Sequence, residues 1–124
     1  MDKYFMILAG AGVGGVLRYV IGAAIMARFG PAFPLGTVLV NISGCLAIGV
    51  IMTIFEKTMP HDNWGFLLVT GLLGGYTTFS SFGWETYVLI RDGSPMKGLM
   101  NAATSLFAGF FAVWCGAMLG RLLR

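Results

Sequence analysis

Four long apolar segments, separated by short connections rich in Pro, Gly and charged residues, constrain the fold of this chain more than any other feature. They cover about residues 4–27, 35–55, 64–90 and 96–123 of a chain of 124 residues. A helix that crosses a bilayer needs about 20 mostly apolar residues, so each segment is long enough for one crossing. Only 10% of the residues are charged, whereas a soluble domain has about 25%. We therefore predict an all-α integral membrane protein in which residues 1–124 form a single transmembrane domain of four helices.

Charge, sulfur and histidine content exclude several classes of function. The net charge is +3 and no cluster of Lys and Arg occurs, so nucleic acid is not an expected partner. Cys45 and Cys115 lie within apolar segments, where we expect two reduced thiols rather than a disulfide or metal ligands. His61 lies in the polar connection before the third segment, and we expect it to be solvated. No Asp or Glu lies at mid-membrane apart from Glu85 near an edge, which argues against catalysis and proton coupling.

The third segment contains an unusual stretch, GLLGGYTTFSSF, over residues 71–82. Neighbouring Ser and Thr side chains compete for backbone groups, and paired glycines weaken a helix. At membrane depth an irregular backbone is tolerated only where it is buried in protein or lines a polar cavity. We therefore predict that the third helix is broken near its middle, between Gly74 and Ser81, and that the break is the functional site. The alternative is a face of small residues that packs against another helix.

Neutral donors accompany this stretch. Phe79 and Phe82 are three residues apart, so on a helical turn they point to one side, and the edge of each ring is electropositive. Hydroxyls, amides and ring edges can surround a small anion without a buried full charge, although paired phenylalanines can also be ordinary core packing. The polar donors within the segments are Asn41, Thr77, Thr78, Ser80, Ser81, Asn101 and Ser105.

Three polar residues outside the stretch leave alternatives open. Asn41 is either a hydrogen-bond clasp between helices or a donor that lines a pore. Arg18 either extends to the interface from the end of the first segment or attracts anions at the mouth of a path. Glu85 is expected to be an interfacial carboxylate, with ion handling as the less favoured alternative.

The distribution of basic residues indicates more than one copy of the chain. Four crossings put both ends on one side, which carries Lys3, Lys57, Arg121 and Arg124. The other side carries Arg28, Arg91 and Lys97, with Arg18 if it emerges there. Such a small bias sets no firm orientation, and four short helices make a thin wall around a polar path. Both features favour a dimer, including one of two opposed copies.

These residues resemble the signature of a known family. The stretch over residues 71–82, followed by Glu85, closely resembles the third-helix motif of the CrcB/Fluc fluoride ion channels. GTVLVNISG over 36–44 and GGVLRY over 14–19 are similar to the second- and first-helix motifs, so the resemblance covers essentially the whole chain. It implies an antiparallel dual-topology homodimer with two fluoride pores along the subunit interfaces. It also implies a channel, not an enzyme, that lets fluoride leave the cytoplasm passively across the bacterial plasma (inner) membrane, which the protein crosses several times.

The resemblance further implies roles for individual residues. Asn41 resembles the pore amide, and Phe79 and Phe82 resemble the ring-edge contacts to fluoride. The backbone carbonyls of Gly74 and Thr77 resemble the ligands of a central structural Na⁺ shared across the dimer interface. The other pore residues implied are Arg18 in the vestibule, Thr78 and Ser80 in the broken turn, and Ser105 on the fourth helix.

The fourth helix departs from the pattern of the family. There a polar track usually begins with Tyr and continues with Ser at four-residue spacing. The corresponding face here is Asn101, Ser105 and Gly109, so Ser105 is expected in the track and the role of Asn101 stays open.

Two other functions fit a small four-helix membrane protein. A dual-topology multidrug exporter has a similar size, but it needs a membrane-buried carboxylate to couple protons, normally in the first segment, and residues 4–27 contain none. A non-transport scaffold would use the glycines only for packing, and substitution of Asn41 would then harm assembly alone.

Overall fold

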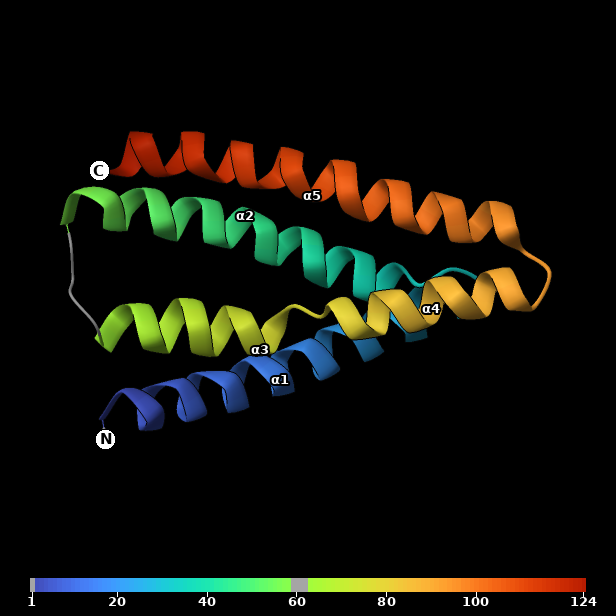
Figure 1. Ribbon diagram of the computed structural model, residues 1–124, viewed down its shortest axis with the longest axis horizontal. Helices are drawn as coiled ribbons and strands as arrows, with labels where there is room; N and C mark the ends of the chain where they lie inside the picture. The colour runs from blue at the N-terminus through green and yellow to red at the C-terminus, as the bar shows by residue number, and fades with distance from the viewer. Residues whose placement is uncertain (1, 59–62) are drawn as a thin grey trace.

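The structure, a computed structural model, describes residues 2–58 and 63–124, and over these residues it is helical with no strand (Figure 1). His61 lies outside the described residues. The elements are α1 (Asp2–Phe29), α2 (Leu35–Thr58), the π-helix η1 (Gly65–Leu73), α3 (Gly74–Tyr76), α4 (Phe79–Arg91) and α5 (Pro95–Leu123). The prediction of an all-α fold is confirmed for this part of the chain.

Within the described residues, three helices are long and apolar enough to cross a membrane, namely α1, α2 and α5. The third apolar segment is divided among η1, α3 and α4, which follow one another along the bundle. The start of α1 and the end of α5 lie at the same end of the molecule (Figure 1). The arrangement is an up-and-down bundle of four helical units, namely α1, α2, the third segment (η1, α3 and α4) and α5.

Residues with restricted or unusual backbone angles lie at the boundaries of the helices. Gly30 has φ of 82°, which only glycine adopts freely, and its N–H bonds to Met26 O at 2.8 Å, closing the last turn of α1. Pro95 begins α5, where a missing N–H costs nothing.

In the turn before α5, the Arg91 guanidinium is 2.7 Å from Asp92 Oδ1, and this bond holds the pKa of the Asp92 carboxyl below its ordinary value.

Two seams of glycine hold the helical units together. In the first, α1 lies so close to η1 and α3 that a Cβ at Gly14 would overlap the carbonyl oxygen of Leu72. In the second, a Cβ at Gly116 of α5 would overlap the carbonyl oxygen of Leu46 in α2. Small residues permit this close approach of helix backbones. The seams leave α2 and η1 less tightly joined, and a groove opens between them.

Candidate functional site

The backbone leaves helical geometry at two residues between α3 and α4. Thr77 has φ −84° and ψ 156°, and Thr78 has φ −148° and ψ 119°, so both are extended. The Asn41 side chain from α2 bonds to both backbone groups of Thr78: its Nδ2 donates to Thr78 O at 2.9 Å, and its Oδ1 accepts from Thr78 N at 2.8 Å. A primary amide thus takes the place of a peptide group. The hydrogen-bond clasp, one of the two predicted roles of Asn41, is formed within a single chain.

The threonine hydroxyls satisfy other backbone groups at this interruption. Thr78 is 8% exposed, and its Oγ1 caps α4 by accepting from Ser81 N at 3.2 Å. The same oxygen lies 3.3 Å from Ser80 Oγ and donates to Ser81 Oγ at 3.1 Å. Thr77 donates both its N–H and its hydroxyl to Leu73 O, each at 2.9 Å. The Thr78 hydroxyl therefore pairs Ser81 N, which the extended turn would otherwise leave without a partner, and the Thr77 hydroxyl adds a second bond to Leu73 O.

The carbonyls of Gly74 and Thr77 are among the backbone carbonyls that lose their helical partners at the interruption. In an α-helix a carbonyl accepts from the N–H four residues later, so Gly74 O would accept from Thr78 N and Thr77 O from Ser81 N. Thr78 N bonds instead to Asn41, and Ser81 N bonds to the Thr78 hydroxyl. The family resemblance implied these two carbonyls as cation ligands, and carbonyl oxygen is a ligand suited to a hard cation. Among the described residues no cluster of His, Cys, Asp or Glu could hold a metal instead.

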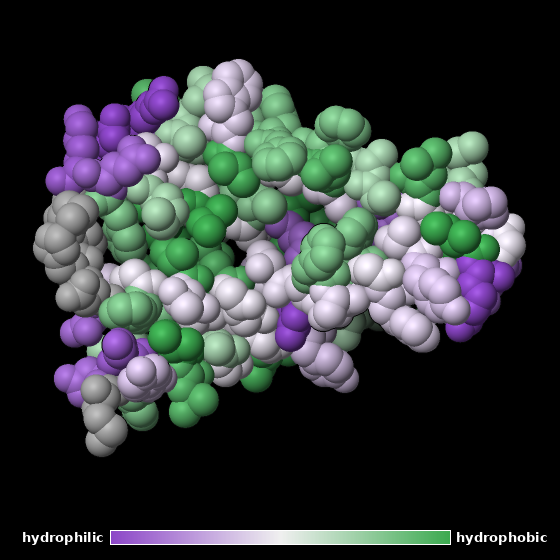
Figure 2. Space-filling view, in the orientation of Figure 1, coloured by the Kyte–Doolittle hydropathy of each residue, from purple (hydrophilic) through white to green (hydrophobic). Residues whose placement is uncertain are grey.

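A groove of about 480 Å³ runs beside the interruption. The hollow is visible on the face of the molecule in Figure 2, where most of the surrounding atoms belong to hydrophobic or neutral residues. It is lined by residues of α2, the third segment and α5: Asn41, Gly44, Cys45, Ile48, Val69, Leu73, Gly74, Thr77, Thr78, Phe79, Phe82, Ser105, Leu106, Gly109, Phe110 and Val113.

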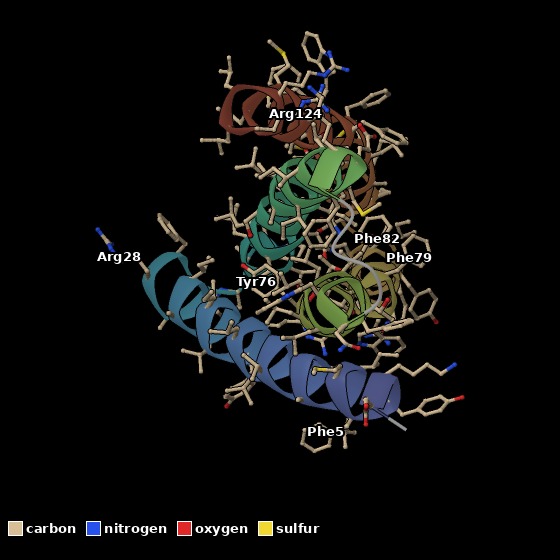
Figure 3. The ribbon with its side chains drawn as sticks, turned by 90° about the vertical axis from the view of Figure 1, so that its left-hand side faces the viewer. Phe5, Arg28, Tyr76, Phe79, Phe82 and Arg124 are labelled. Atoms are coloured by element: carbon tan, nitrogen blue, oxygen red, sulfur yellow. The ribbon has the colours of Figure 1, made fainter. Side chains whose placement is uncertain are left out.

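Two aromatic rings form one edge of this groove. The ring centroids of Phe79 and Phe82 are 5.5 Å apart and the planes are tilted by 46°. Figure 3 shows both side chains projecting to the same side of the molecule, away from Tyr76. The Phe79 side chain is 83% exposed, so in one copy of the chain this ring has no cover. The groove therefore offers amide, hydroxyl and ring-edge donors without a formal charge.

The two polar residues of α5 differ in their surroundings. Ser105 lines the groove, and its Oγ is buried without a hydrogen-bond partner in the described part of the chain. Asn101 is 1% exposed and does not line the groove; its Nδ2 donates to Thr86 Oγ1 at 2.9 Å. Ser105 is thus the α5 donor that faces the groove, whereas Asn101 joins α5 to α4.

Arg18 and Glu85 lie elsewhere, in a second groove of about 530 Å³ between α1, the start of α2, and α4. Glu85 Oε1 accepts a hydrogen bond from Thr37 Oγ1 at 2.7 Å. Within one chain the structure brings together Asn41, Thr77, Thr78, Phe79 and Phe82 with Ser105, but it does not bring Arg18 to them.

The sequence interpretation missed two participants on α2. Thr37, the partner of Glu85, was not given a role, and Cys45 lines the groove as a free thiol. Both lie four residues from Asn41, so all three share one face of the helix. The i, i+4, i+8 spacing of polar or small side chains around Asn41 is the signal that would have found them.

The fold and site define a class: a multi-pass helical membrane protein with a mostly apolar, uncharged groove that carries a few polar donors beside a helix interruption. A family model described as CrcB-like protein, Camphor Resistance (CrcB), matches residues 5–117. The chain belongs to this family, and the resemblance noted in the sequence is confirmed.

Named relatives cover almost the full chain. A protein of Solibacter usitatus called "Fluoride-specific ion channel FluC" is 52% identical over 120 residues, which are 96% of this chain and 98% of the relative. Proteins of the same name from Rhizobium meliloti and Thermus thermophilus are 38% and 36% identical, covering 99% of this chain and 99% and 98% of their own lengths. The family is therefore one of ion channels, and the expectation that the chain is not an enzyme is confirmed by this kinship.

Proposed function

We propose that this chain forms a fluoride-selective channel through which fluoride leaves the cytoplasm passively, lowering its toxicity. The observation that carries the proposal is the groove beside Thr77 and Thr78, where neutral donors meet the tilted ring pair Phe79 and Phe82. A small anion with a dense charge can exchange its hydration shell for such donors, and ring edges add positive potential. The relatives that are named fluoride channels support the same ion.

The functional unit is an antiparallel dual-topology homodimer in a bacterial inner membrane, with two pores. In this unit the interruption at Thr77 and Thr78 lies within the third membrane crossing, as a break near the middle of that helix. The open groove and the unpaired Ser105 hydroxyl in it support a second copy, because a polar group without a partner is unfavourable at membrane depth. Arg18, which lies outside the groove of its own chain, acts at the vestibule formed in the dimer.

The backbone carbonyls of Gly74 and Thr77 would hold a structural Na⁺ at the dimer interface. The redirected N–H groups of Thr78 and Ser81 support this assignment, since they leave those carbonyls without their helical partners. When bound, the ion neutralises the facing carbonyl dipoles of the two copies. The chain's own contribution is to hold the interruption open through Asn41 and Thr78.

Fluoride efflux from liposomes tests the proposal. The purified dimer is reconstituted in vesicles loaded with KF, valinomycin releases K⁺, and an electrode records fluoride outside; a parallel series uses KCl. We expect rapid fluoride release without chloride release, and loss of at least tenfold in fluoride flux for Phe79→Ile and Phe82→Ile, because an aliphatic side chain has no electropositive edge.

The matched control is Phe107→Ile, which changes an exposed ring of α5 outside the groove and is expected to conduct normally. Unchanged fluoride flux in both ring variants, or equal release of chloride, would overturn the proposal. Uptake of a lipophilic cation driven by a pH gradient would indicate the exporter instead.

A further inference from the structure

A series of hydrogen bonds joins α5 to the turn of α4 that bears Phe82. Asn101 Nδ2 donates to Thr86 Oγ1 at 2.9 Å, and Thr86 Oγ1 donates to Phe82 O at 2.8 Å. The Thr86 hydroxyl thus accepts one bond and donates the other. Bonds arranged in series polarise and strengthen one another. The series links the Phe82 carbonyl to α5 through residues that do not line the groove.

The packing around Asn101 gives it a strong hold on α4. The side chain is 1% exposed, so water does not compete for its amide. One turn earlier, a Cβ at Gly98 would lie 2.7 Å from Ile90 Cγ1 and 3.3 Å from Thr86 O. Because α5 approaches α4 this closely at two successive turns, the Asn101 bond sets the register in which the two helices meet.

This register determines one dimension of the groove. Thr86 follows Phe82 by four residues, and Ser105 follows Asn101 by four residues, so the Asn101–Thr86 bond lies one helical turn from the groove on both helices. Phe82 and Ser105 line the groove from α4 and α5 respectively. A shift of α4 along α5 would therefore change the separation between the Phe82 ring and the Ser105 hydroxyl.

We propose that Asn101 is a positioning residue that acts through Thr86 to set the spacing between the Phe82 ring and the Ser105 hydroxyl, and thereby the discrimination of fluoride from larger halides. The effect on ion discrimination rests on the proposed function, whereas the effect on Phe82 does not. Asn101 Oδ1 is buried with no partner in the described residues. Asn101→Leu removes this unpaired acceptor together with its desolvation cost. The variant can therefore lose the positioning of Phe82 and still fold.

The first arm of the test observes Phe82 directly. The full chain carries 4-fluorophenylalanine at position 82 and is studied by ¹⁹F NMR in lipid nanodiscs. Asn101→Leu and Thr86→Val are each expected to shift or split the resonance, while Thr86→Ser, which keeps the hydroxyl, restores the native signal. Thr104→Val removes an exposed hydroxyl of α5 and is the matched control. A label at Phe5 of α1 reports any general change in the fold and is expected to stay constant.

The second arm measures fluoride and chloride efflux for the same variants. Asn101→Leu and Thr86→Val are each expected to lower the ratio of fluoride to chloride flux roughly tenfold, as expected for one buried hydrogen bond, and the double variant no further. An unchanged resonance at position 82 in both single variants overturns the inference, and so does a fully additive double variant. If the unsubstituted chain conducts no fluoride but the variants still change the resonance at position 82, the positioning role of Asn101 is supported and the proposed function is refuted.

Discussion

Asn41 is the residue on which the interruption depends most directly. Its amide supplies one donor and one acceptor to the backbone of Thr78, a match that few side chains of similar size can make. The residue also lines the groove, so a clasp and a groove wall are the same side chain. Both the scaffold hypothesis, in which Asn41 serves assembly alone, and the pore hypothesis predict that substitution of Asn41 lowers stability. Only the pore hypothesis predicts a change in ion flux.

Replacing Asn41 by Leu is expected to destabilise the protein. Leucine has nearly the same volume but leaves the N–H of the buried Thr78 without a partner, at about 1–3 kcal/mol, and removes one of the bonds that Thr78 O accepts. The measurement is the free energy of unfolding in mixed micelles titrated with a denaturing detergent. Asn63→Leu makes the same change at an exposed position before η1 and is expected to stay within about 0.5 kcal/mol. Equal stability of the two variants would contradict the role of the clasp.

Much of this site could be predicted residue by residue from the sequence. Mid-segment amides and hydroxyls are costly in a membrane unless they have a use, and this cost is what drew attention to Asn41, Thr78 and Ser105. The environment of Asn101 could not be inferred in the same way. Its spacing from Ser105 puts both on one side of α5, but a face is wide enough for one residue to reach the groove and the other to reach Thr86.

At the scale of elements, Gly10 and Gly14 of α1 act through close packing of backbones and not through flexibility. Gly14 lies where a Cβ would overlap the Leu72 carbonyl oxygen, while neighbouring Gly15 has open space within 4 Å. Two glycines that adjoin in the sequence thus face entirely different surroundings. The contrast provides a direct test of the seam between α1 and the third segment.

We expect Gly14→Ala to destabilise the protein by about 1–3 kcal/mol, because the helices must move apart to admit the methyl group. Gly15→Ala is expected to be neutral or to stabilise by up to about 1 kcal/mol, since alanine favours a helix. Both variants are compared by the same detergent-induced unfolding. Equal effects would mean that helix propensity, and not the seam, decides the outcome.

Helical segments were predictable because apolar length is a strong signal, but the geometry of η1 was not. A π-helix arises when one extra residue is accommodated in each turn, and it is usually a brief feature near a functional site. Here it spans Gly65–Leu73 and leads directly to the interruption, with the Gly74 N–H shared between Gly71 O and Val69 O. The wider turn of η1 depends on the space that α1 and α2 leave beside it. The apolar pattern of residues 65–73 alone therefore does not predict it.

At the scale of the whole molecule, the residues proposed to form the pore do not all meet within one chain. The groove beside Thr77 and Thr78 is open, Phe79 is uncovered, and Arg18 lies in a separate groove. The nearly even distribution of basic residues indicated a second copy already from the sequence. The partner's contribution could not be predicted further, because pattern within one chain does not specify which faces meet across a two-fold axis. The antiparallel dimer therefore stays a prediction.

Sodium binding provides a test at this scale that does not depend on transport. If Gly74 and Thr77 carbonyls of two copies share one Na⁺, the ion binds only the folded dimer and stabilises it by mass action. Raising Na⁺ from zero to about 100 times its dissociation constant should then add about 2.7 kcal/mol to the free energy of unfolding. The measurement is detergent-induced unfolding of the dimer in Na⁺ salts, with K⁺ salts of equal ionic strength as the control. Thr77→Val keeps the carbonyl in place and is expected to retain the dependence on Na⁺. Equal stabilisation by K⁺ and Na⁺ would point to general screening of charge, and the two carbonyls would then need another partner, such as ordered water.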